Sequence, residues 1–128
     1  MIRYPTAPDM PRSFLPFSPV VQVGNLLFVS GQASVDREGN IVDDSFEGEM
    51  TRAIRNMEAI LQYAGSGLHL VVKTTNYLAD PKYRDEYNRL YPDFFKAPFP
   101  ARTTVAKGLS GSLKYEVDCI AVTAEAAG

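Results

Sequence analysis

Residues 20–32, which read VVQVGNLLFVSGQ, decide the class of fold that this chain can adopt. The stretch is rich in β-branched and apolar residues, and the turn dipeptide Gly24-Asn25 divides it into predicted antiparallel strands at 20–23 and 26–32. Side chains alternate between the two faces of a sheet along a strand. Because the second strand has apolar residues at even and odd positions alike, both faces of the predicted sheet need a cover.

The rest of the chain continues this sheet and adds two amphipathic helices. Five prolines between residues 5 and 19 predict an extended entry segment. The elements predicted after residue 32 are, in order, a helix from Phe46 to Ala64, a strand at 68–79, a helix from Asp80-Pro81 to Phe94, and strands at 101–106 and 113–124. The order ββ-α-β-α-ββ predicts an α+β fold with both helices on one face of a single sheet. The uncovered face predicts a homo-oligomer.

The length and composition of the chain limit the classes of function. With 128 residues, 45% of them hydrophobic and 22% charged, the chain is expected to form one globular domain over 1–128. The net charge is −2 and the Lys and Arg residues are scattered singly, so nucleic acid is not an expected partner. A single cysteine, and the absence of a signal-peptide pattern or a long apolar run, predict a soluble cytoplasmic protein with no membrane partner.

Familiar catalytic motifs are missing from the sequence. His69 is the only histidine, so neither a histidine-based zinc site nor a Ser-His-Asp triad is expected, and we predict no metal. Cys119 lies in an apolar predicted strand and is interpreted as a buried, inert thiol.

The remaining chemistry lies in polar residues of the predicted strands. Alternation places Glu116 and Asp118 on one face, about 7 Å apart. A carboxylate beside apolar neighbours has a raised pKa, which suits proton transfer to and from water; the alternative is that both are charges of an edge strand. Arg102 follows the stiff Pro98-Phe99-Pro100 segment, and its guanidinium matches a carboxylate; the alternative is a solvated surface arginine. If their strands pair as a hairpin, Arg102 and Glu116 lie close together.

Four separate blocks resemble one known family. They are VGNLLFVSGQ at 23–32, VVKTT at 71–75, PFPAR at 98–102 and YEVDCIA at 115–121. In order and spacing they are similar to the RidA/YjgF family of reactive-intermediate deaminases, and the likeness runs from about Pro16 onward. The resemblance implies a chorismate-mutase-like sheet of about six strands with two helices on one face. It also implies a homotrimer with a central β-barrel and sites between subunits.

The resemblance also implies roles for individual residues. Arg102 corresponds to the arginine that pairs with the substrate's carboxylate, and Glu116 to the acid that holds or activates the attacking water. The substrate-binding positions that it implies are Phe17, Ser30, Gly31, Asn88 and the backbone N–H of Thr104. Two of these depart from the family pattern, because Thr104 replaces a cysteine and Phe17 stands where a tyrosine is frequent.

The implied activity is hydrolysis of reactive 2-imino or enamine acids, such as 2-iminopropanoate and 2-aminoacrylate, to 2-keto acids and ammonia. No metal or organic cofactor is expected, because an imine is already electrophilic. The alternative is a non-catalytic binder of small carboxylates, or a chaperone-like member of the same family. An RNA-cleaving role is disfavoured by the low pI of about 5.3. Chorismate mutase activity would rest on fold alone, and fold does not carry function.

Overall fold

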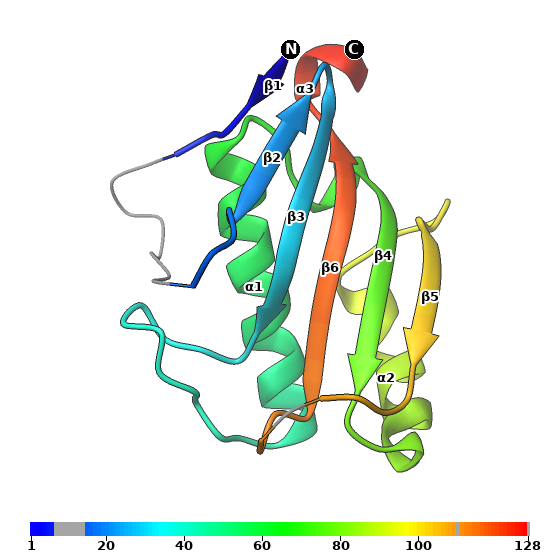
Figure 1. Ribbon diagram of the computed structural model, residues 1–128. Helices are drawn as coiled ribbons and strands as arrows, with labels where there is room; N and C mark the ends of the chain where they lie inside the picture. The colour runs from blue at the N-terminus through cyan, green and yellow to red at the C-terminus, as the bar shows by residue number, and fades with distance from the viewer. Residues whose placement is uncertain (7–14, 110, 128) are drawn as a thin grey trace.

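Six strands form one mixed sheet in the order β1-β2-β3-β6-β4-β5 (Figure 1). The computed structural model describes residues 1–6, 15–109 and 111–127. The strands are β1 (Ile2–Arg3), β2 (Val20–Val23), β3 (Leu26–Ala33), β4 (Val71–Leu78), β5 (Ala101–Val105) and β6 (Tyr115–Val122). The helices are α1 (Phe46–Tyr63), α2 (Arg84–Leu90) and α3 (Ala124–Ala127), with 3₁₀ turns at Leu68–Leu70, Pro81–Tyr83 and Tyr91–Asp93.

The two longer helices, α1 and α2, lie on the same side of the sheet, α1 behind β3 and β6 and α2 toward β4 and β5 (Figure 1). α1 begins at Ser45, whose hydroxyl accepts a hydrogen bond from the N–H of Gly48. The buried carboxylate of Glu49 accepts bonds from the backbone N–H of Asp44 and from the N–H and Nζ of Lys114. These bonds fix the start of α1 against the start of β6.

The core lies between the sheet and these helices, and no described helix or strand covers the opposite face, which we call the open face of the sheet. Along β6, residues 115, 117, 119 and 121 are buried while the residues between them are only half-buried. In β3, Leu27 is fully buried, whereas Leu26 and Phe28 are each 40% exposed. The expectation that two helices cover only one face is therefore confirmed. The homotrimer that would cover the other face remains a prediction.

Three expectations about the sheet need correction. β5 pairs with β4 in parallel and β6 lies between β3 and β4, so the predicted hairpin of the last two strands is wrong. An interior strand cannot carry edge charges, so that interpretation of Glu116 and Asp118 is wrong too. β1, which pairs with β2, was not predicted. The predicted entry segment falls partly at residues 7–14, outside the described residues.

Candidate functional site

Arg102 is held by neutral groups at the outer edge of the sheet. It pairs with the buried Thr74 in the register of β4 and β5, which puts it on the helix-covered side. Its Nη2 donates to Oδ1 of Asn88 at 2.5 Å. Its guanidinium carbon lies 4.8 Å from the ring centroids of both Tyr87 and Tyr91, within the range of cation–π attraction. The side chain is exposed but oriented, so it is not a freely solvated arginine.

A chain of buried hydrogen bonds supports the tyrosine beneath Arg102. The Tyr91 hydroxyl and Oγ1 of Thr74 are 2.7 Å apart, and Nδ2 of Asn76 donates to the same Oγ1 at 3.0 Å. The Tyr115 hydroxyl donates to Oδ1 of Asn76 at 2.5 Å. Burial raises the pKa of Tyr91 and that of Tyr115, so both are neutral phenols at physiological pH. A satisfied buried network of this kind is rigid, and it fixes the ring plane on which Arg102 rests.

Arg102 and Asn88 separate two cavities of different character. One, of about 290 Å³, has walls made mostly of rings: Tyr91, Pro92, Phe99 and Pro100. The other, of about 180 Å³, is lined by polar side chains: Arg84, Tyr87 and Thr104. The hydroxyls of Tyr87 and Thr104 lie 2.9 Å apart at this polar cavity. We call Asn88, Arg102 and Thr104 the arginine half-site.

A second group of predicted residues gathers on the other side of the molecule, around an irregularity in β3. The pairing of β3 with β6 shifts between Val29 and Gln32, so Ser30 and Gly31 form a β-bulge. A Cβ on Gly31 would lie 2.5 Å from Oε2 of Glu116, which shows that the glycine backbone packs against this carboxylate. Oγ of Ser30 donates to the carbonyl of Ser18, next to the half-exposed Phe17. We call Phe17, Ser30, Gly31 and Glu116 the glutamate half-site.

The pKa of the Glu116 carboxyl is raised above its ordinary value. Partial burial is the main cause, and the negative charge of Asp118 on the same face adds to it. Asp118 accepts a hydrogen bond from the Tyr77 hydroxyl at 3.2 Å. A carboxyl whose pKa is displaced upward exchanges protons more readily near neutral pH than an ordinary glutamate does.

The two half-sites do not meet within one chain. Arg102 faces the helix-covered side, Glu116 faces the open side, and β4 lies between their strands. A single chain therefore presents two separate groups of the predicted residues. Sequence reasoning missed Arg84, Tyr87 and Tyr91, and their helical spacing of three and four residues was the signal that could have placed them together.

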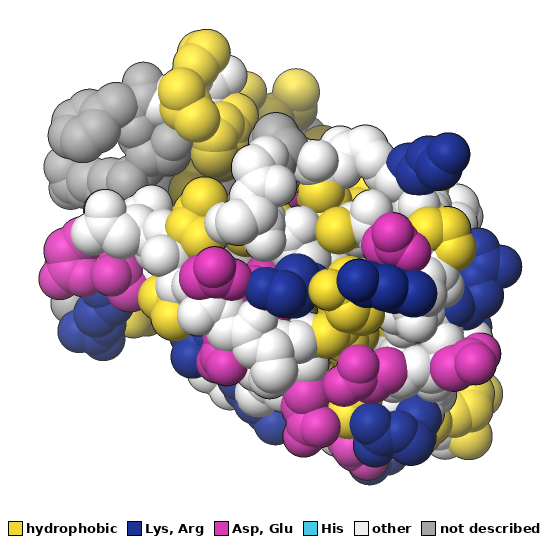
Figure 2. Space-filling view, turned by 90° about the horizontal axis from the view of Figure 1, so that it is seen from below, with side chains coloured by type: hydrophobic (Ala, Val, Ile, Leu, Met, Phe, Trp, Pro, Cys, Tyr) yellow, Lys and Arg dark blue, Asp and Glu magenta, His cyan; other side chains and the backbone are white. Residues whose placement is uncertain are grey.

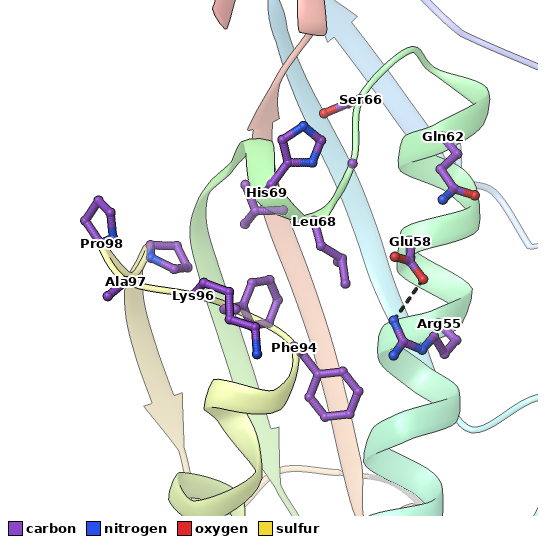
Figure 3. Close-up of a pocket in the computed structure, with 14 residues that line it drawn as sticks. Arg55, Glu58, Gln62, Ser66, Leu68, His69, Phe94, Lys96, Ala97 and Pro98 are labelled. Atoms are coloured by element: carbon purple, nitrogen blue, oxygen red, sulfur yellow. Dashed lines mark hydrogen bonds and ion pairs between the residues drawn. The ribbon is translucent and has the colours of Figure 1, made fainter.

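A larger cavity, of about 550 Å³, lies elsewhere and contains none of the predicted residues. It separates α1 from the segment that follows α2 (Figure 3). Arg55 bonds to Glu58 at 3.0 Å and lies over the Phe94 ring, so that side chain is already occupied. The exposed His69 also lines this cavity (Figure 3).

Cys119 and the described acidic residues outside the two half-sites offer no thiol or metal site. The thiol is 2% exposed, and burial together with Asp118 raises its pKa to about 12, so it is inert as predicted. Among the described residues, no group of three or more His, Cys, Asp or Glu side chains could hold a metal ion. On the face seen from below, Lys and Arg side chains alternate with Asp and Glu (Figure 2), unlike the continuous basic patch typical of nucleic-acid binding. No helix in the described ranges is long and apolar enough to cross a membrane.

Comparison with known proteins agrees with the resemblance seen in the sequence. The family model described as Endoribonuclease L-PSP matches residues 8–123. A RutC family protein of Pyrococcus abyssi is 37% identical over 113 residues, which are 87% of this chain and 89% of that protein. The chloroplastic Reactive Intermediate Deaminase A of Arabidopsis thaliana is 36% identical over 87% of this chain and 60% of its own length. The crystal structure of the Rid family protein YyfA from Yersinia pestis superimposes with a TM-score of 0.87 at 27% identity, over 96% of this chain and 100% of that chain.

Proposed function

The chain belongs to the RidA/YjgF family, whose model carries the name endoribonuclease L-PSP, and from this we propose that it hydrolyses 2-imino acids to 2-keto acids and ammonia. The substrates that fit are 2-iminopropanoate and its relatives, with their enamine tautomers. The observation that carries the proposal is Arg102, a guanidinium oriented by an amide and two rings with no carboxylate partner among the described residues. Such a group is ready for a substrate's carboxylate.

In the proposed reaction each half-site has its own task. Arg102 binds the carboxylate of the substrate and so fixes the position of C2. Glu116 accepts a proton from a water molecule as the water oxygen attacks C2, and it then passes this proton to the imine nitrogen, which gives a neutral carbinolamine. Glu116 next takes the hydroxyl proton of the carbinolamine and delivers it to the amino nitrogen, so that ammonia leaves as the C2–N bond breaks and the C2=O bond forms. The raised pKa of Glu116 helps it to return the proton to the departing nitrogen.

The separation of the half-sites leads to a proposal about assembly. We infer that the arginine half-site of one copy and the glutamate half-site of another face each other across an interface, as in the homotrimer that the family resemblance implies. The open sheet face, with Leu26 and Phe28 each 40% exposed, supplies apolar surface for such packing.

The compartment in which the protein works stays a prediction. We predict the cytoplasm from the sequence, while the relative from Arabidopsis is named as chloroplastic.

A coupled assay tests the activity. An amino-acid oxidase generates 2-iminopropanoate from alanine, and semicarbazide traps the imine that escapes hydrolysis. The protein is expected to reduce semicarbazone formation, and Arg102→Met is expected to abolish that effect. Arg89→Met is the matched control, because Arg89 lies on α2, pairs with Glu86 and lines neither cavity. Full activity of Arg102→Met would refute the assignment, and inactivity of the wild type would favour the non-catalytic binder.

Mixed oligomers test the assembly. An inactive Arg102→Met chain and an inactive Glu116→Gln chain are refolded together in equal amounts. If each site takes one half from each of two copies, about a quarter of the sites contain both intact residues, and activity returns to about that fraction of the wild-type value. No recovery, in mixtures shown by mass spectrometry to contain both chains, would contradict the shared site.

A further inference from the structure

A second guanidinium, that of Arg84, lines the same polar cavity as Arg102. This cavity of about 180 Å³ is formed by Arg84, Tyr87, Asn88, Arg102 and Thr104. Arg84 is the first residue of α2 and its side chain is exposed. Its guanidinium makes no ion pair, hydrogen bond or ring contact with any other described residue. Its charge is therefore not neutralised by any described residue.

The charge of Arg102, like that of Arg84, is not neutralised by any described residue. Its described partners are the amide oxygen of Asn88 and two aromatic rings, all of them neutral. None of the described Asp and Glu residues lines the cavity. Two cations thus share a polar space without a counterion, and this arrangement favours a ligand that carries two negative groups.

The other groups in the cavity suit such a ligand. Tyr87 and Thr104 share one hydrogen bond, so whichever hydroxyl does not donate to the other can donate to a carboxylate oxygen. Burial raises the pKa of Tyr87, so its phenol stays neutral and does not repel an anion. The cavity on the other side of Arg102 is walled by Phe99 and three further rings. Arg102 is the only cation among its described lining residues, so these residues offer no charged partner to a second carboxylate.

We propose that the cavity between Arg84 and Arg102 binds dicarboxylic 2-imino acids of four or five carbons, with the carboxylate next to the imine on Arg102 and the distal carboxylate on Arg84. This inference rests on the proposed imine hydrolysis for its chemistry. The two arginines come from different elements, α2 and β5, so each can bind one carboxylate with its own fork of donors. A small single oxyanion such as phosphate would be the competing occupant.

Kinetics with two substrates test the inference. Oxidases convert aspartate or glutamate to the dicarboxylic imine and alanine to the monocarboxylic one, and semicarbazide trapping measures both. Arg84→Met keeps the aliphatic stem and removes the charge; it is expected to lower the diacid-to-monoacid ratio of kcat/KM at least tenfold. Arg89→Met, on the same helix but outside the cavity, is expected to leave the ratio unchanged. If the ratio is also unchanged in Arg84→Met, the inference is wrong while the proposed hydrolysis stands.

Binding of stable keto acids keeps the two proposals distinguishable. If the wild type hydrolyses neither imine, the proposed function fails, and calorimetry with 2-oxoglutarate and 2-oxobutanoate decides the inference alone. Tighter binding of 2-oxoglutarate that is lost in Arg84→Met would support the dicarboxylate site. Equal binding of the two keto acids, or Arg84-dependent binding of inorganic phosphate alone, would overturn it.

Discussion

The arginine half-site and the glutamate half-site are built by opposite means. Arg102 rests on Tyr87 and Tyr91, above a buried hydrogen-bond network, and its described partners are all neutral. Glu116 lies on the uncovered face, against a glycine backbone, with a second acid on the same strand. A cation that must bind an external carboxylate has to keep its charge unpaired. An acid that must exchange protons benefits from a neighbour that raises its pKa, and these two needs are met on opposite faces of one sheet.

Among variants that keep Arg102, the largest expected effect comes from removing the acid. Glu116→Gln keeps the shape of the side chain and removes its proton exchange, so kcat for 2-iminopropanoate should fall about 100-fold or more. KM should change little, because the carboxylate of the substrate is bound by Arg102. Steady-state semicarbazide trapping at varied imine concentrations measures both constants. A Glu116→Gln protein with altered KM and normal kcat would reverse the roles assigned to the two half-sites.

A smaller loss is expected from adding a methyl group at the bulge. In Gly31→Ala the new Cβ would lie 2.5 Å from Oε2 of Glu116, so the carboxylate must move. We expect kcat to fall about tenfold, since small misplacements of a catalytic group are costly. The double variant Gly31→Ala/Glu116→Gln should be no slower than Glu116→Gln alone, because the alanine acts through the glutamate. Additive losses would show that Gly31 has a separate role.

Two substitutions of Tyr91, whose ring lies beneath Arg102, should distinguish the role of the ring from that of the hydroxyl. Tyr91→Leu removes one cation–π contact, worth about 1 kcal/mol, and should raise KM several-fold. Tyr91→Phe keeps the ring but loses the bond to Thr74, so it should lower the free energy of unfolding by about 1 kcal/mol and leave KM nearly unchanged. Urea denaturation and steady-state kinetics measure the two. Equal KM values for both variants would show that the Tyr91 ring does not orient Arg102.

The smallest expected effect is a pH-dependent gain in the melting temperature of Glu116→Gln over that of the wild type. Folding raises the pKa of Glu116, so its contribution to stability is fully present below the pKa of the unfolded chain and is lost as the pH rises through the folded pKa. Glu116→Gln should therefore melt a few degrees higher than the wild type at pH 8, and the difference should shrink toward pH 4. Melting curves across this range check the sign. A wild type that gains stability over Glu116→Gln with rising pH would contradict it.

Local patterns were sufficient to predict the elements and the faces of the sheet. The alternation in residues 115–122 correctly placed Glu116 and Asp118 on the same face of the strand, and the turn at Gly24-Asn25 correctly placed β2 beside β3. Helical spacing in 46–64 located α1 to within one residue. These patterns are formed by residues only a few positions apart in the chain, so they can be recognised without knowing which distant segments meet.

The errors concern contacts between distant segments. The parallel pairing of β4 with β5, and the position of β6 between β3 and β4, depend on which strands meet after the chain has folded. The expected hairpin of β5 and β6, which would have brought Arg102 close to Glu116, was wrong because this pairing also depends on distant segments. Arg84 was missed because its importance arises only when α2 packs beside β5 and closes the polar cavity.

The central position of β6 has a consequence for how the molecule matures during translation. This strand follows all the others in the chain, yet both of its edges are occupied, by β3 and by β4. Until it leaves the ribosome, the β1–β3 unit and the β4–β5 unit have no strand to join them. The nascent protein therefore exposes two unpaired, partly apolar edges late in synthesis, when chaperone capture would be most useful.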